Sequence, residues 1–156
     1  MRVEIALPDD MRLDAKESDE SLGSVAFDRE RDHPVVGAPR QSITAFLTGT
    51  RNVVVQASLA DAVSEARADF CPRSARCDEL LREALPSGGW IVTLRTDKAV
   101  QTVATKPGSP GRAFVCGAEA FALFADPGQK TWLDDAAEIK KARDVIEGIC
   151  RSARAT

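Results

Sequence analysis

The sequence is poor in the side chains on which most enzymes and metal sites depend. Its 156 residues contain no tyrosine and one histidine, His33, whose neighbours in sequence offer no partner for a catalytic base. Motifs for dinucleotides, phosphates, activated serines and catalytic zinc are missing as well. We therefore expect no cofactor and no metal, and we favour a protein that is not an enzyme.

Two further absences limit the classes of partner that the protein can be expected to have. No run of residues approaches the roughly 20 apolar positions of a membrane-spanning helix, so we expect no membrane span. The 21 basic and 24 acidic side chains are interspersed and give a formal charge of −3, which argues against a nucleic-acid partner. The content of 44% hydrophobic and 29% charged residues is typical of a globular protein, and the length suits a single domain over residues 1–156.

The residues that are present indicate an α+β fold organised around residues 90–116. Three segments are rich in β-branched and aromatic residues, namely 90–94, 100–105 and 113–116. A turn at 96–99 and a loop with two prolines and two glycines at 106–111 separate them. This pattern predicts a three-strand meander whose apolar face other elements must cover.

Other strands are expected nearer the N-terminus. Alternating or β-rich stretches predict strands over 3–7, 11–15, 24–27, 43–47 and 53–57. The last two would form a hairpin, because Gly49 and Asn52 in their connection both tolerate positive φ. The acidic stretch Lys16–Ser21 is interpreted as an exposed connection rather than as an anion-rich binding tip.

Two central helices are predicted between these strands and the meander. Ser58 and Asp61 form a capping pattern before an apolar face that extends to Phe70. Ser74 would cap a second helix, in which apolar residues over 77–85 recur at spacings of three and four.

A long C-terminal helix is predicted from about Trp132 to Ala153, introduced by the capping pair Thr131 and Asp134. The short alanine-rich run 117–124 suits either a helix or a strand. The expected fold is thus α+β: a mostly antiparallel sheet of five to seven strands, packed by two central helices and a long C-terminal helix.

The four cysteines are placed where disulfides would join elements. Cys71 and Cys77 flank a proline-containing loop, Cys116 ends a predicted core strand, and Cys150 lies on the apolar face of the last helix. We predict the pairs 71–77 and 116–150 among three possible connectivities. The alternatives are four buried reduced cysteines, a zinc site with unusual spacing, or a catalytic cysteine that would need His33 as its base.

Disulfides favour a compartment outside the reducing cytosol. The chain starts without a basic segment followed by an apolar one, so we expect a periplasmic or secreted protein whose signal peptide has been removed. The alternative is a cytoplasmic protein with reduced thiols. The alanine- and arginine-rich composition suggests a bacterial source.

The two ends of the chain resemble a known family. The opening stretch IALPDD at 5–10 and the closing stretch IEGICRSAR at 146–154 are similar to the ends of PsbP/Mog1-type α/β domains. In that family a strand containing Leu-Pro opens the fold, and a helix with a late serine closes it. The resemblance implies a non-enzymatic accessory or adaptor domain with a central antiparallel sheet.

We therefore predict a non-enzymatic exported domain that binds another protein, in an adaptor, accessory or immunity-type role, stabilised by two disulfides. A small hydrolase would instead need two Asp or Glu side chains in one pocket with pKa values pushed apart. A lipid- or small-ligand-binding domain would need an enclosed apolar cavity. Arg73 and Arg76 could receive a phosphate or carboxylate, although solvated surface charges are the simpler interpretation.

Overall fold

A computed structural model describes residues 1–19, 24–31, 40–49, 52–123 and 125–156. The strands in chain order are β1 Val3–Glu4, β2 Arg12–Asp19, β3 Ser24–Arg31, β4 Gln41–Thr48, β5 Cys77–Ala84, β6 Trp90–Thr96, β7 Ala99–Pro107, β8 Ala113–Ala122 and β9 Arg154–Ala155. The helices are α1 Leu59–Phe70, the short 3-10 helix η2 Trp132–Asp134 and α2 Ala136–Ser152.

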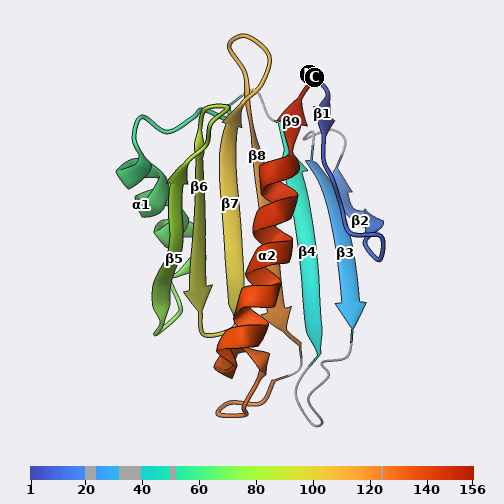
Figure 1. Cartoon of the computed structure of the whole chain (residues 1–156), viewed down its shortest axis with the longest axis vertical. Helices are drawn as coiled ribbons and strands as arrows, with labels where there is room; N and C mark the ends of the chain where they lie inside the picture. The colour runs from blue at the N-terminus through green and yellow to red at the C-terminus, as the bar shows by residue number, and fades with distance from the viewer. Residues whose placement is uncertain (20–23, 32–39, 50–51, 124) are drawn as a thin grey trace.

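The architecture is a mixed α+β fold. Seven strands form an antiparallel sheet in the order β2-β3-β4-β8-β7-β6-β5, while β1 and β9 form a separate antiparallel pair (Figure 1). The predicted meander is confirmed as β6, β7 and β8, and the predicted α+β class with its long C-terminal helix is confirmed as well. His33 lies outside the described residues.

The two helices cover opposite faces of the sheet. Ile91 packs in the cluster beneath α2, whereas its neighbours Val92 and Leu94 pack in the cluster beneath α1. Alternating residues of a strand point to opposite faces, so α1 and α2 lie on different sides. The helix α2 packs mainly across β7 and β8, with Ile146 and Ile149 buried, while α1 packs mainly on β6 and β5.

The prediction of a second central helix over 77–85 is wrong, because these residues form the edge strand β5. The pairing of β5 with β6 shifts between Glu79 and Leu81, so one extra residue is inserted there. Leu80 and Leu81 therefore both pack against the cluster beneath α2. The extra residue breaks the two-residue alternation of a strand and produces an apolar spacing that imitates a helix.

The predicted hairpin between 43–47 and 53–57 is also wrong: its first strand is present as β4, but residues 53–57 form no strand. β4 pairs with β3 on one side and β8 on the other, so no strand edge beside it is free. Residues 52–57 instead run as an extended connection toward α1, where Trp90 Nε1 donates a hydrogen bond to the Gln56 carbonyl at 2.8 Å.

Four smaller points concern where elements start and end. The strand expected over 3–7 is limited to β1, and residues 16–19 belong to β2 rather than to a connection. Residues 117–122 form a strand, because β8 is paired on both sides to that point. Thr131 and Asp134 form a capping box at η2, and Asp135 caps α2.

The chain termini are held together by backbone and side-chain hydrogen bonds. Ala6 N donates to Ser152 Oγ at 2.9 Å, and Thr156 N donates to the Arg2 carbonyl at 3.0 Å. The two segments that carry the PsbP/Mog1 resemblance therefore lie side by side, next to the pair β1–β9 (Figure 1). In the described residues no helix has the length and apolar character needed to cross a membrane.

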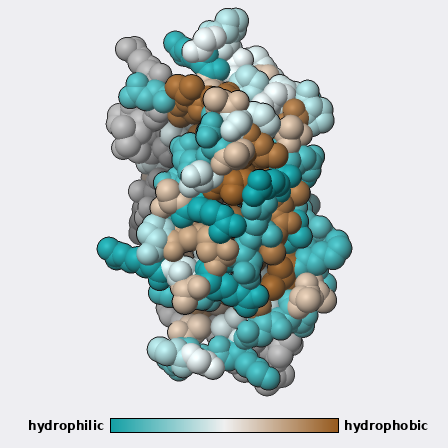
Figure 2. All heavy atoms as spheres, turned by 90° about the vertical axis from the view of Figure 1, so that its left-hand side faces the viewer, coloured by the Kyte–Doolittle hydropathy of each residue, from teal (hydrophilic) through white to brown (hydrophobic). Residues whose placement is uncertain are grey.

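The edge strand β5 carries charged side chains beside the half-buried Leu80 and Leu81. Ion pairs join Glu79 to Arg82 and Glu83 to Arg151. Seen from this side, teal polar groups interrupt the brown apolar ones (Figure 2). Charges and a bulge on an edge strand oppose pairing with a further strand, so β5 is protected against sheet extension.

The structure contains two disulfides in different environments. Cys116–Cys150 joins β8 to α2, and both residues are fully buried. Cys71–Cys77 closes a short loop between α1 and β5, and both of its residues are half-buried. In the chain-entropy model the longer loop contributes about 4 kcal/mol and the shorter one about 2 kcal/mol.

The first prediction concerns these thiols. Denatured but unreduced protein from an oxidising compartment should have no free thiol, and peptide mapping should recover the pairs 71–77 and 116–150. Mild reductant added to the native protein should open Cys71–Cys77 first, because the other pair is buried. Four free thiols in protein from its native compartment would contradict the disulfide assignment.

A second prediction concerns the buried Lys106, which closes the C-terminal end of α2. Its Nζ donates hydrogen bonds to the carbonyls of Arg151 at 2.9 Å and Ala153 at 2.5 Å. Lys106→Met removes both, so the free energy of unfolding should fall by about 1.5–3 kcal/mol in urea denaturation. The matched change Lys140→Met, on the exposed side of α2, should alter it by less than about 0.5 kcal/mol.

Candidate functional site

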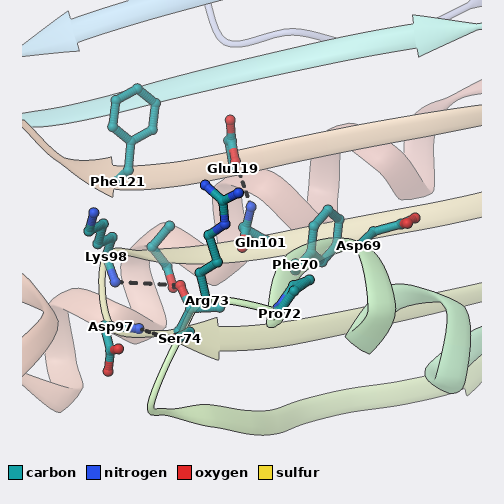
Figure 3. Close-up of a pocket in the computed structure, with 12 residues that line it drawn as sticks. Asp69, Phe70, Pro72, Arg73, Ser74, Asp97, Lys98, Gln101, Glu119 and Phe121 are labelled. Carbon is teal, nitrogen blue, oxygen red and sulfur yellow. Dashed lines mark hydrogen bonds between the residues drawn. The ribbon is translucent and has the colours of Figure 1, made fainter.

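One pocket lies on the α1 side of the sheet, beyond the part that α1 covers. It has a volume of about 550 Å³ and opens to solvent between the end of α1, the Cys71–Cys77 loop, the β6–β7 turn and the strands β7 and β8 (Figure 3). Its lining residues are Asp69, Phe70, Pro72, Arg73, Ser74, Thr96, Asp97, Lys98, Ala99, Gln101, Glu119 and Phe121.

The register of β7 and β8 builds the floor of this pocket. Gln101 lies opposite Glu119, and Ala99 lies opposite Phe121. The amide of Gln101 donates to Glu119 Oε2 at 2.8 Å, and the hydroxyl of Thr44 lies 3.4 Å from Oε1 of the same carboxylate. The carboxylate of Glu119 is thus held by neutral donors.

The disulfide loop forms one wall and is fastened to the β6–β7 turn. Ala75 N donates to Asp97 Oδ2 at 2.8 Å, and Asp97 N donates to Ser74 Oγ at 3.0 Å. The backbone N–H of Ala75, with further help from Ser74, lowers the pKa of the Asp97 carboxyl. Because the loop is closed by Cys71–Cys77, these contacts fix the backbone position of Arg73.

Two cations on the rim of the pocket have no side-chain partner among the described residues. Arg73 comes from the disulfide loop and Lys98 from the β6–β7 turn, and both are exposed. Arg76, the other arginine that the sequence suggested for an anion, does not line the pocket and is paired with Asp78. Of the two arginines, Arg76 is thus held in an ion pair outside the pocket, whereas Arg73 lines the pocket and has no side-chain partner among the described residues.

The carboxylates in the pocket do not form the arrangement that a hydrolase would need. Figure 3 shows the Asp97 carboxylate turned away from the floor, and its pKa is lowered. Glu119 accepts a hydrogen bond from Gln101, and Asp69 lies at the end of the pocket away from Lys98. In the described ranges no group of three His, Cys, Asp or Glu side chains could hold a metal ion.

A second hollow of about 510 Å³ lies on the same sheet face, at the other end of β7 and β8. The extended segment 52–57 forms one of its walls, and Thr105 and Val115 contribute from the strands. Between the two hollows, Phe46 lies against Gly117, and a Cβ on that glycine would come within 2.0 Å of the ring. We call this surface of β7 and β8, from Phe121 to Val115, the open face.

Comparisons with known proteins support the fold. No protein-family model matches the chain, and no curated protein matches it. The crystal structure of LpqN, a protein involved in cell envelope biogenesis of Mycobacterium tuberculosis, is similar to it. The TM-score is 0.53 with 15% sequence identity, over 97% of this chain and 82% of LpqN. This similarity shows a shared fold.

Sequence reasoning found the disulfide loop but missed the pocket. The floor residues Gln101 and Glu119 are polar positions in predicted or ambiguous strands, and only the strand register shows that they meet. Two sequence signals were available: Arg73, which was considered as a receiver of an anion, and Gly117, because a glycine inside a strand indicates close approach of another group.

A third prediction tests the docking of the disulfide loop. The pKa of Asp97 is lower in the folded state than in the unfolded state. Its contribution to the stability of the fold is therefore fully present above the unfolded pKa of about 3.9 and is lost as the pH falls through the folded pKa. Asp97→Ala should therefore abolish exchange protection of the Ala75 amide and lower the urea midpoint at pH 7. The difference from wild type should shrink as the pH falls below about 3.9.

The matched control is Asp126→Ala, a change in an exposed turn far from the loop in sequence. It should leave protection of the Ala75 amide unchanged. Full protection of that amide in the Asp97→Ala protein would show that the loop does not depend on this carboxylate.

Proposed function

We propose that the protein is a non-enzymatic exported domain that binds another protein through the open face. The observation that carries this proposal is one open pocket that is lined both by the half-buried Phe70 and Phe121 and by two cations, Arg73 and Lys98, which have no side-chain partner among the described residues. Arginine and aromatic side chains are enriched at the energetic centres of protein interfaces.

An extracytoplasmic location is supported by two independent features. Disulfides persist in oxidising compartments, and this chain has two of them. LpqN, which has a similar fold, is involved in cell envelope biogenesis. A role in the bacterial envelope, as an accessory or adaptor domain, agrees with both features.

Protein binding is favoured over the two alternative functions by the shape and polarity of the pocket. A hydrolase needs one carboxyl with a raised pKa near an ionised one, whereas the Asp97 carboxyl has a lowered pKa and faces the disulfide loop. A lipid site needs an enclosed apolar cavity, whereas this pocket is open and has Gln101 and Glu119 in its floor.

The proposal is tested by photo-crosslinking in cells of the source organism. A benzoylphenylalanine replacing Phe121, which lines the pocket, should give one protein adduct of defined mass. The same group replacing Lys140, on the exposed side of α2, should give none. The captured protein, purified, should bind the full chain in a one-to-one complex.

Further variants separate binding from folding. Phe121→Ala should weaken the purified complex at least about tenfold, a typical loss at an interface centre. Its circular dichroism spectrum should match that of wild type, because Phe121 is only half-buried. Equal adducts at positions 121 and 140, or none at either, would contradict binding through the open face.

A further inference from the structure

We propose that the Cys71–Cys77 disulfide is a site of thiol–disulfide exchange with a small external thiol. The thiol attacks Sγ of Cys71, and Cys77 leaves as a thiolate that the guanidinium of Arg67 stabilises. This chemistry belongs to the disulfide loop itself and does not depend on the proposed binding of a partner protein.

This bridge is the accessible one of the two disulfides. Both of its cysteines are half-buried, and the loop residues next to them are exposed, whereas Cys116 and Cys150 are fully buried. Cys71 directly follows α1 and Cys77 begins β5, so the bridge lies where these two elements meet at the edge of the sheet (Figure 1). An external thiol therefore reaches this bridge while the core stays folded.

A guanidinium lies against one sulfur of the bridge. Arg67 extends from the last turn of α1. Its Nη1 donates hydrogen bonds to the Cys77 carbonyl at 3.0 Å and to Cys77 Sγ at 3.2 Å. A positive charge beside a sulfur favours the thiolate form, and a stabilised thiolate leaves a disulfide faster. The contact thus favours Cys77 as the leaving group.

The other sulfur belongs to a residue at the unfavourable end of a helix for negative charge. Cys71 is the C-terminal cap of α1, and its backbone N–H donates to the Arg67 carbonyl at 3.0 Å. The C-terminal end of a helix carries a partial negative charge, which disfavours a thiolate there. The helix end and the guanidinium therefore favour the same direction of exchange.

The acidic side chains next to Cys77 in the chain do not cancel the charge of Arg67. Arg67 Nη2 lies 3.6 Å from Glu79 Oε2, whereas Arg82 Nη2 lies 2.7 Å from the same oxygen. Asp78 is paired with Arg76. Three guanidiniums thus share two carboxylates in this group. The nitrogen of Arg67 that contacts the sulfur is not the one that pairs with Glu79.

The exchange proceeds in steps that balance atoms and electrons. The external thiolate forms a new S–S bond to Cys71 Sγ, and the old bond breaks with its electron pair on Cys77. Cys77 then attacks Cys71 Sγ again and expels the thiol, or it takes up a proton from water. If a second external thiolate attacks the first, Cys71 is released as a thiolate. Two external thiols then become one disulfide, and their two electrons reduce the bridge.

The loop has contacts that do not involve either sulfur. Asp97 accepts from Ala75 N and donates from its own N to Ser74 Oγ, and Ser74 N donates to the Cys71 carbonyl at 3.1 Å. We expect these bonds to hold the loop near β5 after the bridge opens. The two sulfurs then stay close together, and their high effective concentration makes the opening reversible.

The test maps where a small thiol attaches. The full-length, disulfide-bonded protein is mixed with glutathione without oxygen, quenched after short times with excess N-ethylmaleimide, and analysed by peptide mapping. Glutathione should be found on Cys71 about fivefold more often than on Cys77, the factor that one exposed charge contact supplies. Cys116 and Cys150 should carry none, because both are buried.

A second measurement covers the case in which reclosure is faster than trapping. The Cys71–Cys77 bridge is first reduced with a limiting amount of a phosphine. Substoichiometric iodoacetamide at pH 7 should then label Cys77 about fivefold faster than Cys71, because the thiolate is the reactive form and the charge of Arg67 favours it on Cys77.

Variants assign the direction to Arg67. Arg67→Gln should lower both preferences to about twofold or less, the part that the helix end supplies. Arg76→Gln is the matched control from the disulfide loop, and it should keep both preferences because Arg76 is paired with Asp78. Both variants should keep the exchange protection of the Ala75 amide. A lost preference then reflects the missing charge and not a detached loop.

Three outcomes would overturn this inference. The first is an equal or reversed distribution of label between Cys71 and Cys77 in the two measurements. The second is an Arg67→Gln protein that keeps both preferences. The third is reduction of Cys116–Cys150 before Cys71–Cys77. None of them affects the crosslinks expected from position 121, so the proposed function is tested separately.

Discussion

Burial of one face of α2 against β7 and β8 is the interaction on which the rest of the structure depends. It brings Ile146, Ile149 and Cys150 onto the sheet and places the buried disulfide between Cys150 and Cys116 of β8. The chain termini are brought together beside the end of this helix. Since α2 occupies this face, any recognition by β7 and β8 must use the other one.

The opposite face is only partly covered, and this creates the candidate site. The helix α1 packs mainly on β6 and β5 and leaves the same face of β7 and β8 only partly covered. Polar residues are tolerated there because one side faces solvent, which explains how Gln101 and Glu119 come to lie in a strand floor. The pocket therefore follows from a short helix lying on a wide sheet.

The two disulfides have separate roles. Cys116–Cys150 joins the C-terminal helix to the sheet inside the core, where its contribution is to stability. Cys71–Cys77 closes a loop that is also hydrogen-bonded to Asp97, and it thereby limits the positions that the backbone of Arg73 can take. A restrained cation loses less conformational freedom on binding than a free one.

Local patterns in the sequence determined several elements of this fold. The capping pair at Ser58 and Asp61 fixed the start of α1, and the apolar stripe before Ala153 identified α2. The β-rich segments over 90–116 identified the meander, because residues that suit a pleated surface are concentrated there. These features depend on neighbours a few positions away in the chain.

Only the tertiary structure decided the rest. The bulge in β5 made a strand resemble a helix, since an inserted residue changes the apolar spacing. Residues 52–57 have strand composition, yet β4 already has two partners, so these residues pair with no strand. The pocket joins Arg73, Lys98 and Glu119 through strand register and loop docking. Contacts between distant segments have no local signature, and so the site emerged only from the folded chain.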